Sequence, residues 1–304
     1  MSKTILITGG TGLVGSQLSR ILKQKGYHII HLSRKENLES TFPAYQWDIN
    51  KGTIDKRALE QADYIVHLAG AGVADKSWTK KRKQAIVDSR VKSGALLQAK
   101  LKEIGKSPKA VICASASGFY GNRGDKILDE NAIIGSGFLA EVVKSWEKAN
   151  HGFTDLGIRT VQLRIGIVLS TKGGALAKML PSYKVRTGAY FGSGNQYYSW
   201  IHINDLCEMF IHALENENVT GVYNAVAPEP VTNKYLAEAI GKTMQKSILL
   251  VPAPAFALRL AMGEMASIVL DGVRISSEKI KKTGFKFLYE DVNLALNDLI
   301  KRNI

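Results

Sequence analysis

Runs of apolar residues alternate with helical repeats of apolar residues along most of the chain. The runs predict strands, which lie at 3–8, 27–33, 45–47, 64–68, 110–114, 160–165 and 221–225. Apolar residues at helical spacing predict helices over 13–25, 80–104 and 137–151. Apolar strands separated by helices are typical of a parallel sheet that is covered on both faces. The pattern therefore predicts an α/β fold with a doubly wound, Rossmann-type parallel sheet.

The pattern changes beyond about residue 170. Glycine-rich loops at 172–174 and 188–194 alternate with short elements. We expect a dinucleotide-binding domain over 1–170, to which 200–227 returns, and a smaller C-terminal α/β lobe over 171–304. Ligands of doubly wound sheets bind beyond the carboxyl ends of the strands, so the functional residues are expected at that edge.

The composition is that of a protein with a packed core, since 45% of the 304 residues are hydrophobic. The apolar stretch at 248–263 contains Pro252, Pro254 and Arg259, so it is not expected to span a membrane. No basic leader precedes the first strand, and the two cysteines lie in apolar patterns without metal-binding spacing. We expect a cytoplasmic protein with reduced thiols, without a metal and without a membrane partner.

The chain is basic, with 41 Lys and Arg against 27 Asp and Glu and a formal charge of +14. Such an excess occurs in nucleic-acid-binding proteins. Here the lysines are scattered, and the densest run, at 76–83, leads into an amphipathic helix as a solvated face would. A polyanionic cofactor accounts for some of the charge, and we expect no nucleic-acid partner.

The segment TGGTGLVG at 8–15 follows the first apolar run. Glycines at 9, 12 and 15 permit a tight turn, close approach of the backbone to a pyrophosphate, and close packing of the next helix. That helix would direct its free N–H groups at the phosphates. Glycine-rich turns also serve ordinary strand-to-helix packing, but the position after the first strand favours a dinucleotide. The residues expected at the cofactor here are Gly9, Thr11, Gly12, Leu13 and Val14.

The end of the second strand distinguishes NAD from NADP. An acidic residue there would bind the ribose hydroxyls, whereas a basic one would accept a 2′-phosphate. The sequence has Ser33 and Arg34 at this place, which favours NADP(H) unless Arg34 and Lys35 are simply exposed turn residues. Asp48, after the third strand, suits the adenine amino group, although aspartate also opens turns for structural reasons.

With these features in place, the chain resembles the extended short-chain dehydrogenase/reductases, and within them the atypical NADP-binding group of epimerase family proteins that carry their own C-terminal segment. The resemblance runs nearly end to end. The matching stretches are 9–12, 33–35, 68–70, 89–90, 115–121 (SASGFYG), 138–140, 146–147, 164–169, 173–174, 192–196, 199–202, 205–206, Asn224 and Pro228. It implies a cofactor site made from the glycine turn, Ser33, Arg34, Leu68, Ala69, Gly70 and Arg90.

The superfamily transfers a proton through a Tyr, with a Lys four residues later that lowers its pKa, and a Ser that orients the substrate. Counting back from Trp146 and Glu147, these Tyr and Lys positions fall on Leu139 and Val143. Lys144 is one residue away and faces about 100° around the helix. The usual dyad is therefore expected to be missing.

Two interpretations follow from that absence. In the first, the chain is an NADP(H)-dependent oxidoreductase or epimerase-like enzyme acting on a small polar substrate by hydride transfer. Its catalytic candidates are Tyr120 with Ser115, just past the fifth strand, and His202 with Asp205 from the second lobe. In the alternative, it is a non-catalytic NADP(H)-binding regulatory or interaction protein.

The structural alternatives for these side chains stay open in the sequence. Tyr120 then packs under the cofactor and His202 is a satisfied core residue. Arg164 binds either an anionic substrate group or a buried carboxylate such as Glu147. The run after the glycine loop, Gln196, Tyr197, Tyr198 and Trp200, either faces the nicotinamide end or packs. The sequence leaves both a monomer and a homodimer open.

Overall fold

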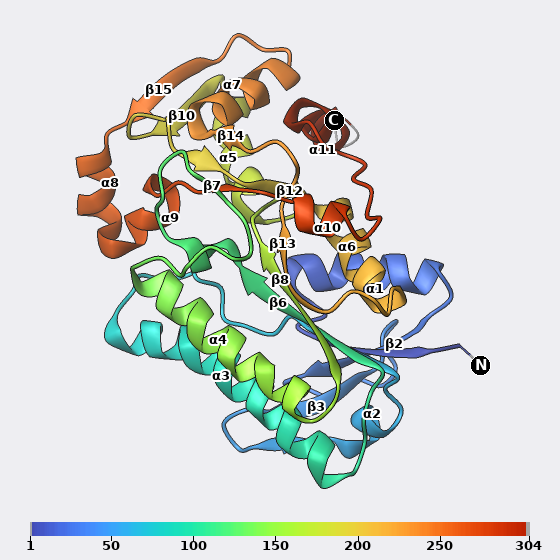
Figure 1. Cartoon of the computed structure of the whole chain (residues 1–304). Helices are drawn as coiled ribbons and strands as arrows, with labels where there is room; N and C mark the ends of the chain where they lie inside the picture. The colour runs from blue at the N-terminus through green and yellow to red at the C-terminus, as the bar shows by residue number, and fades with distance from the viewer. Residues whose placement is uncertain (1, 302–304) are drawn as a thin grey trace.

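A parallel sheet forms the centre of the molecule (Figure 1). The computed structural model describes residues 2–301. The strands, in order across the eight-stranded sheet, are β13 (Gly221–Ala225), β8 (Arg159–Ile165), β6 (Ala110–Ala116), β5 (Tyr64–His67), β1 (Thr4–Thr8), β2 (His28–Ser33), β3 (Ala44–Asp48) and β4 (Thr53–Ile54). Neighbours pair in parallel except β3 and β4, which are antiparallel. The predicted doubly wound fold is confirmed.

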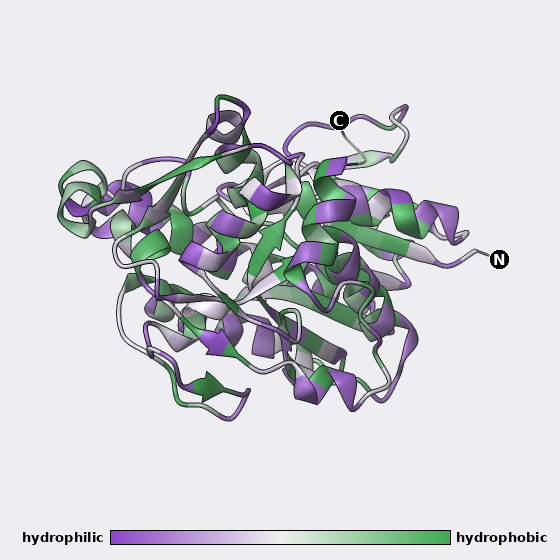
Figure 2. Ribbon diagram, turned by 90° about the horizontal axis from the view of Figure 1, so that it is seen from above, coloured by the Kyte–Doolittle hydropathy of each residue, from purple (hydrophilic) through white to green (hydrophobic). Residues whose placement is uncertain are grey.

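Helices cover both faces of this sheet. Helices α1 (Leu13–Gln24) and α6 (Ile203–Glu215) pack on one face, while α2 (Lys56–Glu60), α3 (Lys80–Glu103) and α4 (Phe138–Asp155) lie on the other (Figure 1). The central strand β1 shows why two cores form, because Ile5 and Ile7 enter one core and Leu6 the other. Hydropathy colouring shows the same arrangement, with apolar strands inside and polar residues on the outer helix surfaces (Figure 2).

Short paired strands connect the sheet to the C-terminal half. The pairs are β9 (Ile167–Leu169) with β12 (Trp200–His202), β10 (Thr187–Phe191) with β15 (Leu249–Ala253), β11 (Tyr197–Tyr198) with β14 (Val231–Thr232), and β7 (Ile127–Leu128) with β16 (Arg274–Ile275). The accompanying helices are α5 (Gly174–Lys184), α7 (Asn233–Thr243), α8 (Ala255–Met262), α9 (Ser267–Leu270), α10 (Glu278–Lys281) and α11 (Val292–Lys301), with short 3₁₀ turns η1 (Ser117–Tyr120) and η2 (Gly263–Ala266). Their own core contains Trp200, Tyr183 and Leu296.

The expected return of the chain to the main sheet is made by β13, which pairs with β8. Strand β12, in the same predicted segment, instead pairs with β9 outside that sheet. Cys113 and Cys207 are buried and free, as predicted. Over residues 2–301, no helix has both the length and the apolar character that crossing a bilayer requires.

Candidate functional site

The glycine turn joins β1 to α1, and the backbone packs too closely at Gly9 and Gly15 to leave room for a side chain. Gly9 has a φ of +70°, and a Cβ there would lie 3.0 Å from the Leu68 carbonyl carbon. A Cβ on Gly15 would lie 2.4 Å from the Gly9 carbonyl oxygen. Gly12 is the N-cap of α1, and no side chain caps the helix. The first-turn amides are therefore available to an anion, as a pyrophosphate cradle requires.

A buried hydrogen-bond chain holds the turn against the end of β5. The Thr8 hydroxyl oxygen accepts from the Leu68 and Ala69 amides at 3.1 Å each and lies 2.8 Å from His67 Nδ1. Because that oxygen already accepts two hydrogen bonds, the Thr8 hydroxyl is the donor in its contact with His67 Nδ1. His67 Nε2 then donates to Ser93, 3.1 Å away. Burial lowers the pKa of His67 to about 4, so the neutral ring that this chain needs is present at neutral pH.

A cavity of about 470 Å³ lies at the end of β2. Thr11, Ser33 and Lys35 are among its lining residues, and Arg34 is exposed beside them. No carboxylate lines this cavity. Asp48 lies at the end of β3, where its Oδ1 accepts from the Asn50 and Lys51 amides and thereby closes a turn.

Arg90 reaches from α3 toward the end of β5. Its Nη1 donates to the carbonyl oxygens of Ala71 and Ile86, and its guanidinium lies 4.9 Å from the centre of the Trp146 ring. A Cβ on Gly70 would lie 3.1 Å from the guanidinium carbon. Burial lowers the pKa of Arg90 to about 10, which leaves the side chain charged at neutral pH. The predicted Leu68–Gly70 and Arg90 sites thus lie together.

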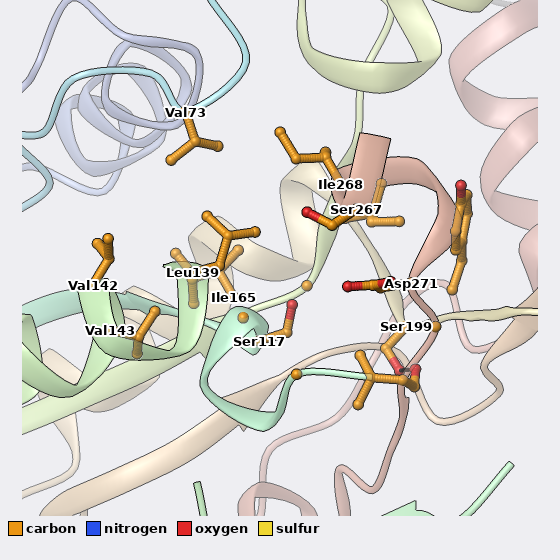
Figure 3. A pocket seen from close by; sticks show the side chains of 18 of the residues that line it. Val73, Ser117, Leu139, Val142, Val143, Ile165, Ser199, Ser267, Ile268 and Asp271 are labelled. Carbon is orange, nitrogen blue, oxygen red and sulfur yellow. Dashed lines mark hydrogen bonds between the residues drawn. The ribbon is translucent and has the colours of Figure 1, made fainter. Parts of the chain in front are cut away.

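A second, smaller cavity of about 290 Å³ opens at the carboxyl ends of β6 and β8, and it is called the main cavity because of this position at the centre of the sheet edge (Figure 3). Leu139 and Val143 both line it, at the positions that the Tyr and Lys of the superfamily would occupy. Lys144 is exposed on the outer side of α4. Ser117, rather than Ser115, contributes its side chain to this cavity.

Tyr120 and Ser115 belong to a buried polar network outside the lining of the main cavity. The Tyr120 hydroxyl donates to Asn224 Oδ1 at 2.6 Å and accepts from Arg164 Nη1 at 3.0 Å. Arg164 forms a two-pronged pair with Glu147, both contacts at 2.8 Å, and Ser115 donates to the same carboxylate. Burial raises the pKa of the Tyr120 phenol. This geometry favours the structural alternatives for Tyr120 and Arg164.

The structure does not bring His202 or Asp205 to the main cavity. His202 is the N-cap of α6, where Nδ1 accepts from the Asn204 amide, and its Nε2 lies 3.3 Å from Asp298 on α11. The buried carboxylate of Asp205 accepts from the amides of Leu288 and Tyr289. Both side chains therefore hold the C-terminal segment against α6.

The residues after the glycine loop differ in whether they reach the main cavity. Tyr197 and Tyr198 line the main cavity. Trp200 is fully buried and donates to the Glu229 carbonyl oxygen, and Gln196 donates to the carbonyl oxygens of Phe191 and Val269.

Sequence reasoning missed the C-terminal wall of the main cavity. Ser267, Ile268 and Asp271 line it, and the Asp271 carboxylate points into it (Figure 3). Burial raises the pKa of Asp271, and Arg259 opposes that shift. The one local sign of this wall is Gly272, where a Cβ would lie 2.7 Å from the Tyr197 amide nitrogen.

Comparison with known proteins agrees with this architecture. The model of the NAD dependent epimerase/dehydratase family matches residues 5–225. The chain belongs to this family. A domain of unknown function, DUF1731, matches 253–299, the segment that supplies the C-terminal wall. The family resemblance expected from the sequence is thereby confirmed.

Individual relatives match over nearly the whole chain. An epimerase family protein of Staphylococcus aureus (strain NCTC 8325 / PS 47) is 36% identical over 302 residues, covering 98% of this chain and 99% of that protein. The crystal structure of human epimerase family protein SDR39U1 (isoform 2) with NADPH has a TM-score of 0.88 at 28% identity, covering 99% of this chain and all of that one. A nucleoside-diphosphate sugar epimerase from Corynebacterium glutamicum has a TM-score of 0.80 at 32% identity, covering 99% of this chain and 58% of that chain.

Proposed function

We propose that this epimerase family member is an NADP(H)-dependent oxidoreductase that works without the Tyr–Lys dyad. The observation that carries the proposal is the end of β2, where Ser33 and Lys35 line a cavity, Arg34 between them is exposed, and no carboxylate is among the described lining residues. A guanidinium and a hydroxyl at this place suit a 2′-phosphate. The NADPH present in the SDR39U1 structure supports the same choice.

The residues of this chain fit the dinucleotide in a consistent order along the sheet edge. The uncapped amides after Gly12 would bind the pyrophosphate, and Arg90 would supply positive charge beside Gly70. When bound, NADPH supplies a hydride equivalent to an electrophilic carbon. Ser117 faces the main cavity and would hydrogen-bond the oxygen on that carbon, while water supplies the proton.

A second candidate function is an NADP(H)-binding protein without turnover. Leu139 and Val143 favour it, because neither can transfer a proton from the wall of the main cavity. Tyr120 has its hydroxyl committed to Asn224 and Arg164. Cofactor binding is common to both candidates, whereas consumption of the cofactor distinguishes them.

The test combines binding and turnover in one preparation. NADPH is expected to raise the melting temperature, and it should be oxidised when aldehydes, ketones and nucleotide sugars are supplied in turn. Binding without oxidation by any of these would support the second candidate. Absence of binding would overturn both.

A further inference from the structure

The main cavity is walled mostly by apolar side chains. Leu139, Val142 and Val143 of α4 face Ile268 of the C-terminal segment across the cavity (Figure 3). Val73, Trp146, Ile165, Ile167 and Val273 also line it. A ligand enclosed there exchanges water for hydrocarbon over most of its surface.

Polar side chains also line the main cavity, and they are Arg90, Ser117, Ser136, Tyr197, Tyr198, Ser199, Ser267 and Asp271. Ser117, Ser267 and Asp271 are labelled in Figure 3, and the Asp271 carboxylate is directed inward. The hydroxyls of Tyr198, Ser199 and Ser267 already donate to the carbonyl oxygens of Val269, Val273 and Glu264, whereas Ser117 can donate to a carbonyl oxygen of a ligand. The larger part of the lining is apolar, which suits an apolar body better than the many hydroxyls of a sugar ring.

Charge also argues against a nucleoside diphosphate in this cavity. A diphosphate needs several cations or free amides. Among the residues of 2–301 that line the cavity, Arg90 and Asp271 are the charged side chains. In the proposed function Arg90 supplies its charge to the dinucleotide, and the Asp271 carboxylate would repel a phosphate of the substrate.

The apolar character continues beyond the cavity. A neighbouring cavity of about 450 Å³ shares Ser267 and Asp271 with it, and Trp78, Phe138 and Leu270 are among its lining residues. The rings of Trp78 and Phe138 meet edge to face with centroids 4.8 Å apart. The neighbouring cavity also holds Arg259 and Glu264, and Glu264 is paired with Lys83. A substrate longer than the main cavity would therefore pass along aromatic and aliphatic surface.

We infer that the substrate is an aldehyde or ketone with an apolar body, whose oxygen lies at Ser117. This inference rests on the proposed function and departs from the small polar substrate expected from the sequence. The carbonyl carbon accepts the hydride equivalent, the C–O π electrons move to the oxygen, and a proton from water completes the alcohol. NADPH becomes NADP⁺ and one proton is consumed.

The first test measures binding without turnover. Straight-chain primary amides, from butanamide to decanamide, imitate the carbonyl compound but are not reduced. Their affinity for the NADP⁺-bound protein, followed by tryptophan fluorescence, should rise about fourfold for each added methylene. An affinity that does not change with chain length, while NADP⁺ itself binds, would overturn the apolar substrate and leave the cofactor assignment intact.

The second test compares substrates. Oxidation of NADPH should be faster with decanal than with butanal, and UDP-glucose should support none. Turnover of UDP-glucose with no turnover of the aldehydes would contradict the inference. A protein that binds neither NADPH nor NADP⁺ would instead refute the proposed function.

A pair of variants in the same segment locates the binding surface. Ile268→Ser should weaken decanamide binding about tenfold and leave NADP⁺ affinity unchanged, because it replaces an apolar wall residue by a polar one. Leu288→Ser is the matched control, since Leu288 is 68% exposed and does not line the main cavity. Equal decanamide affinity in both variants would place the apolar ligand elsewhere.

Discussion

In the proposed function, single side chains at the end of β2 determine which nucleotide is preferred. Ser33 and Lys35 line the cavity there, Arg34 between them is exposed, and the described residues of that lining include no carboxylate. An arginine at this place forms charge-assisted hydrogen bonds with a phosphate but has no comparable partner on a bare ribose. Discrimination between NADPH and NADH should therefore depend on this one guanidinium more than on any backbone feature.

Replacing that guanidinium should separate the two nucleotides. Arg34→Ala is expected to weaken NADPH binding about tenfold to one-hundredfold, the usual effect of losing hydrogen bonds to a charged group, and to leave NADH binding unchanged. Calorimetric titration measures both affinities. Lys148→Ala, at an exposed position on α4, is the control. Equal losses for NADPH and NADH would show that Arg34 does not read the 2′-phosphate.

Tyr120 offers a second test at this scale. In Tyr120→Phe, Asn224 Oδ1 and Arg164 Nη1 lose a buried partner, so the free energy of unfolding should fall by about 1–3 kcal/mol. Urea denaturation measures this loss. The rate of NADPH oxidation per folded molecule should stay within a factor of about three. A loss of turnover above about one-hundredfold with unchanged stability would make Tyr120 the proton donor instead.

Among elements, the junction of β1, β5 and α3 decides how rigidly the cofactor edge is held. The hydroxyl of Thr8 holds the amides that follow β5, and its proton is accepted by His67. His67 in turn contacts Ser93 on α3. Because the whole chain of bonds requires a neutral imidazole, acid should loosen it.

Stability should therefore depend on pH below neutrality. Burial lowers the pKa of His67 to about 4 and that of His31 to about 4, whereas an unfolded histidine titrates near 6.5. Between these values the unfolded chain binds more protons, so the free energy of unfolding should fall as the pH drops from 6.5 to 5. The expected slope is about 1 kcal/mol per pH unit for each histidine.

A variant tests whether the junction of β1, β5 and α3 causes this pH dependence. His67→Gln should reduce the slope of the free energy of unfolding against pH by about 1 kcal/mol per pH unit, as measured by urea denaturation from pH 7 to pH 5. His151→Gln, at an exposed histidine, should retain the full slope. A slope that is equal in both variants would mean that His67 is already charged in the folded protein.

The strands and helices could be predicted from local sequence patterns, but the residues at which they end could be predicted less well. Alternation of Ile5, Leu6 and Ile7 between two cores is a property of any strand buried on both faces, so β1 was predictable. Helix α4 continues to Asp155, past the predicted end at 151, because Phe153 packs in the core. The wall formed by Ser267, Ile268 and Asp271 was missed, since its place at the cavity depends on pairing with distant residues such as Tyr197.

In the whole molecule, the C-terminal segment completes a cavity that the first 225 residues leave open. Asp205 is fully buried and holds the Leu288 and Tyr289 amides, and His202 contacts Asp298. The predicted site residues near the glycine turn lie together because they follow neighbouring strands of one sheet. His202 was expected to approach the site from the second lobe, but its contacts are decided by where α11 docks.

Loss of the attachment of the C-terminal segment at Asp205 should affect the main cavity more than the edge formed by the glycine turn and the end of β2. In Asp205→Asn, an amide nitrogen replaces an oxygen opposite a backbone donor, so the free energy of unfolding should fall by about 1–3 kcal/mol. Limited proteolysis should cut within 253–299 sooner, while NADPH affinity stays unchanged. Asp125→Asn, at an exposed site, is the control. Unchanged proteolysis in Asp205→Asn would show that the segment is held by other contacts.

The central claim is that the edge formed by the glycine turn and the end of β2 binds a phosphorylated nicotinamide dinucleotide. Isothermal titration of the purified protein with NADPH, and separately with NADH, tests it directly. We predict saturable binding of NADPH that is about tenfold tighter or more than binding of NADH. The absence of heat with both nucleotides, or equal affinity for the two, would contradict the claim.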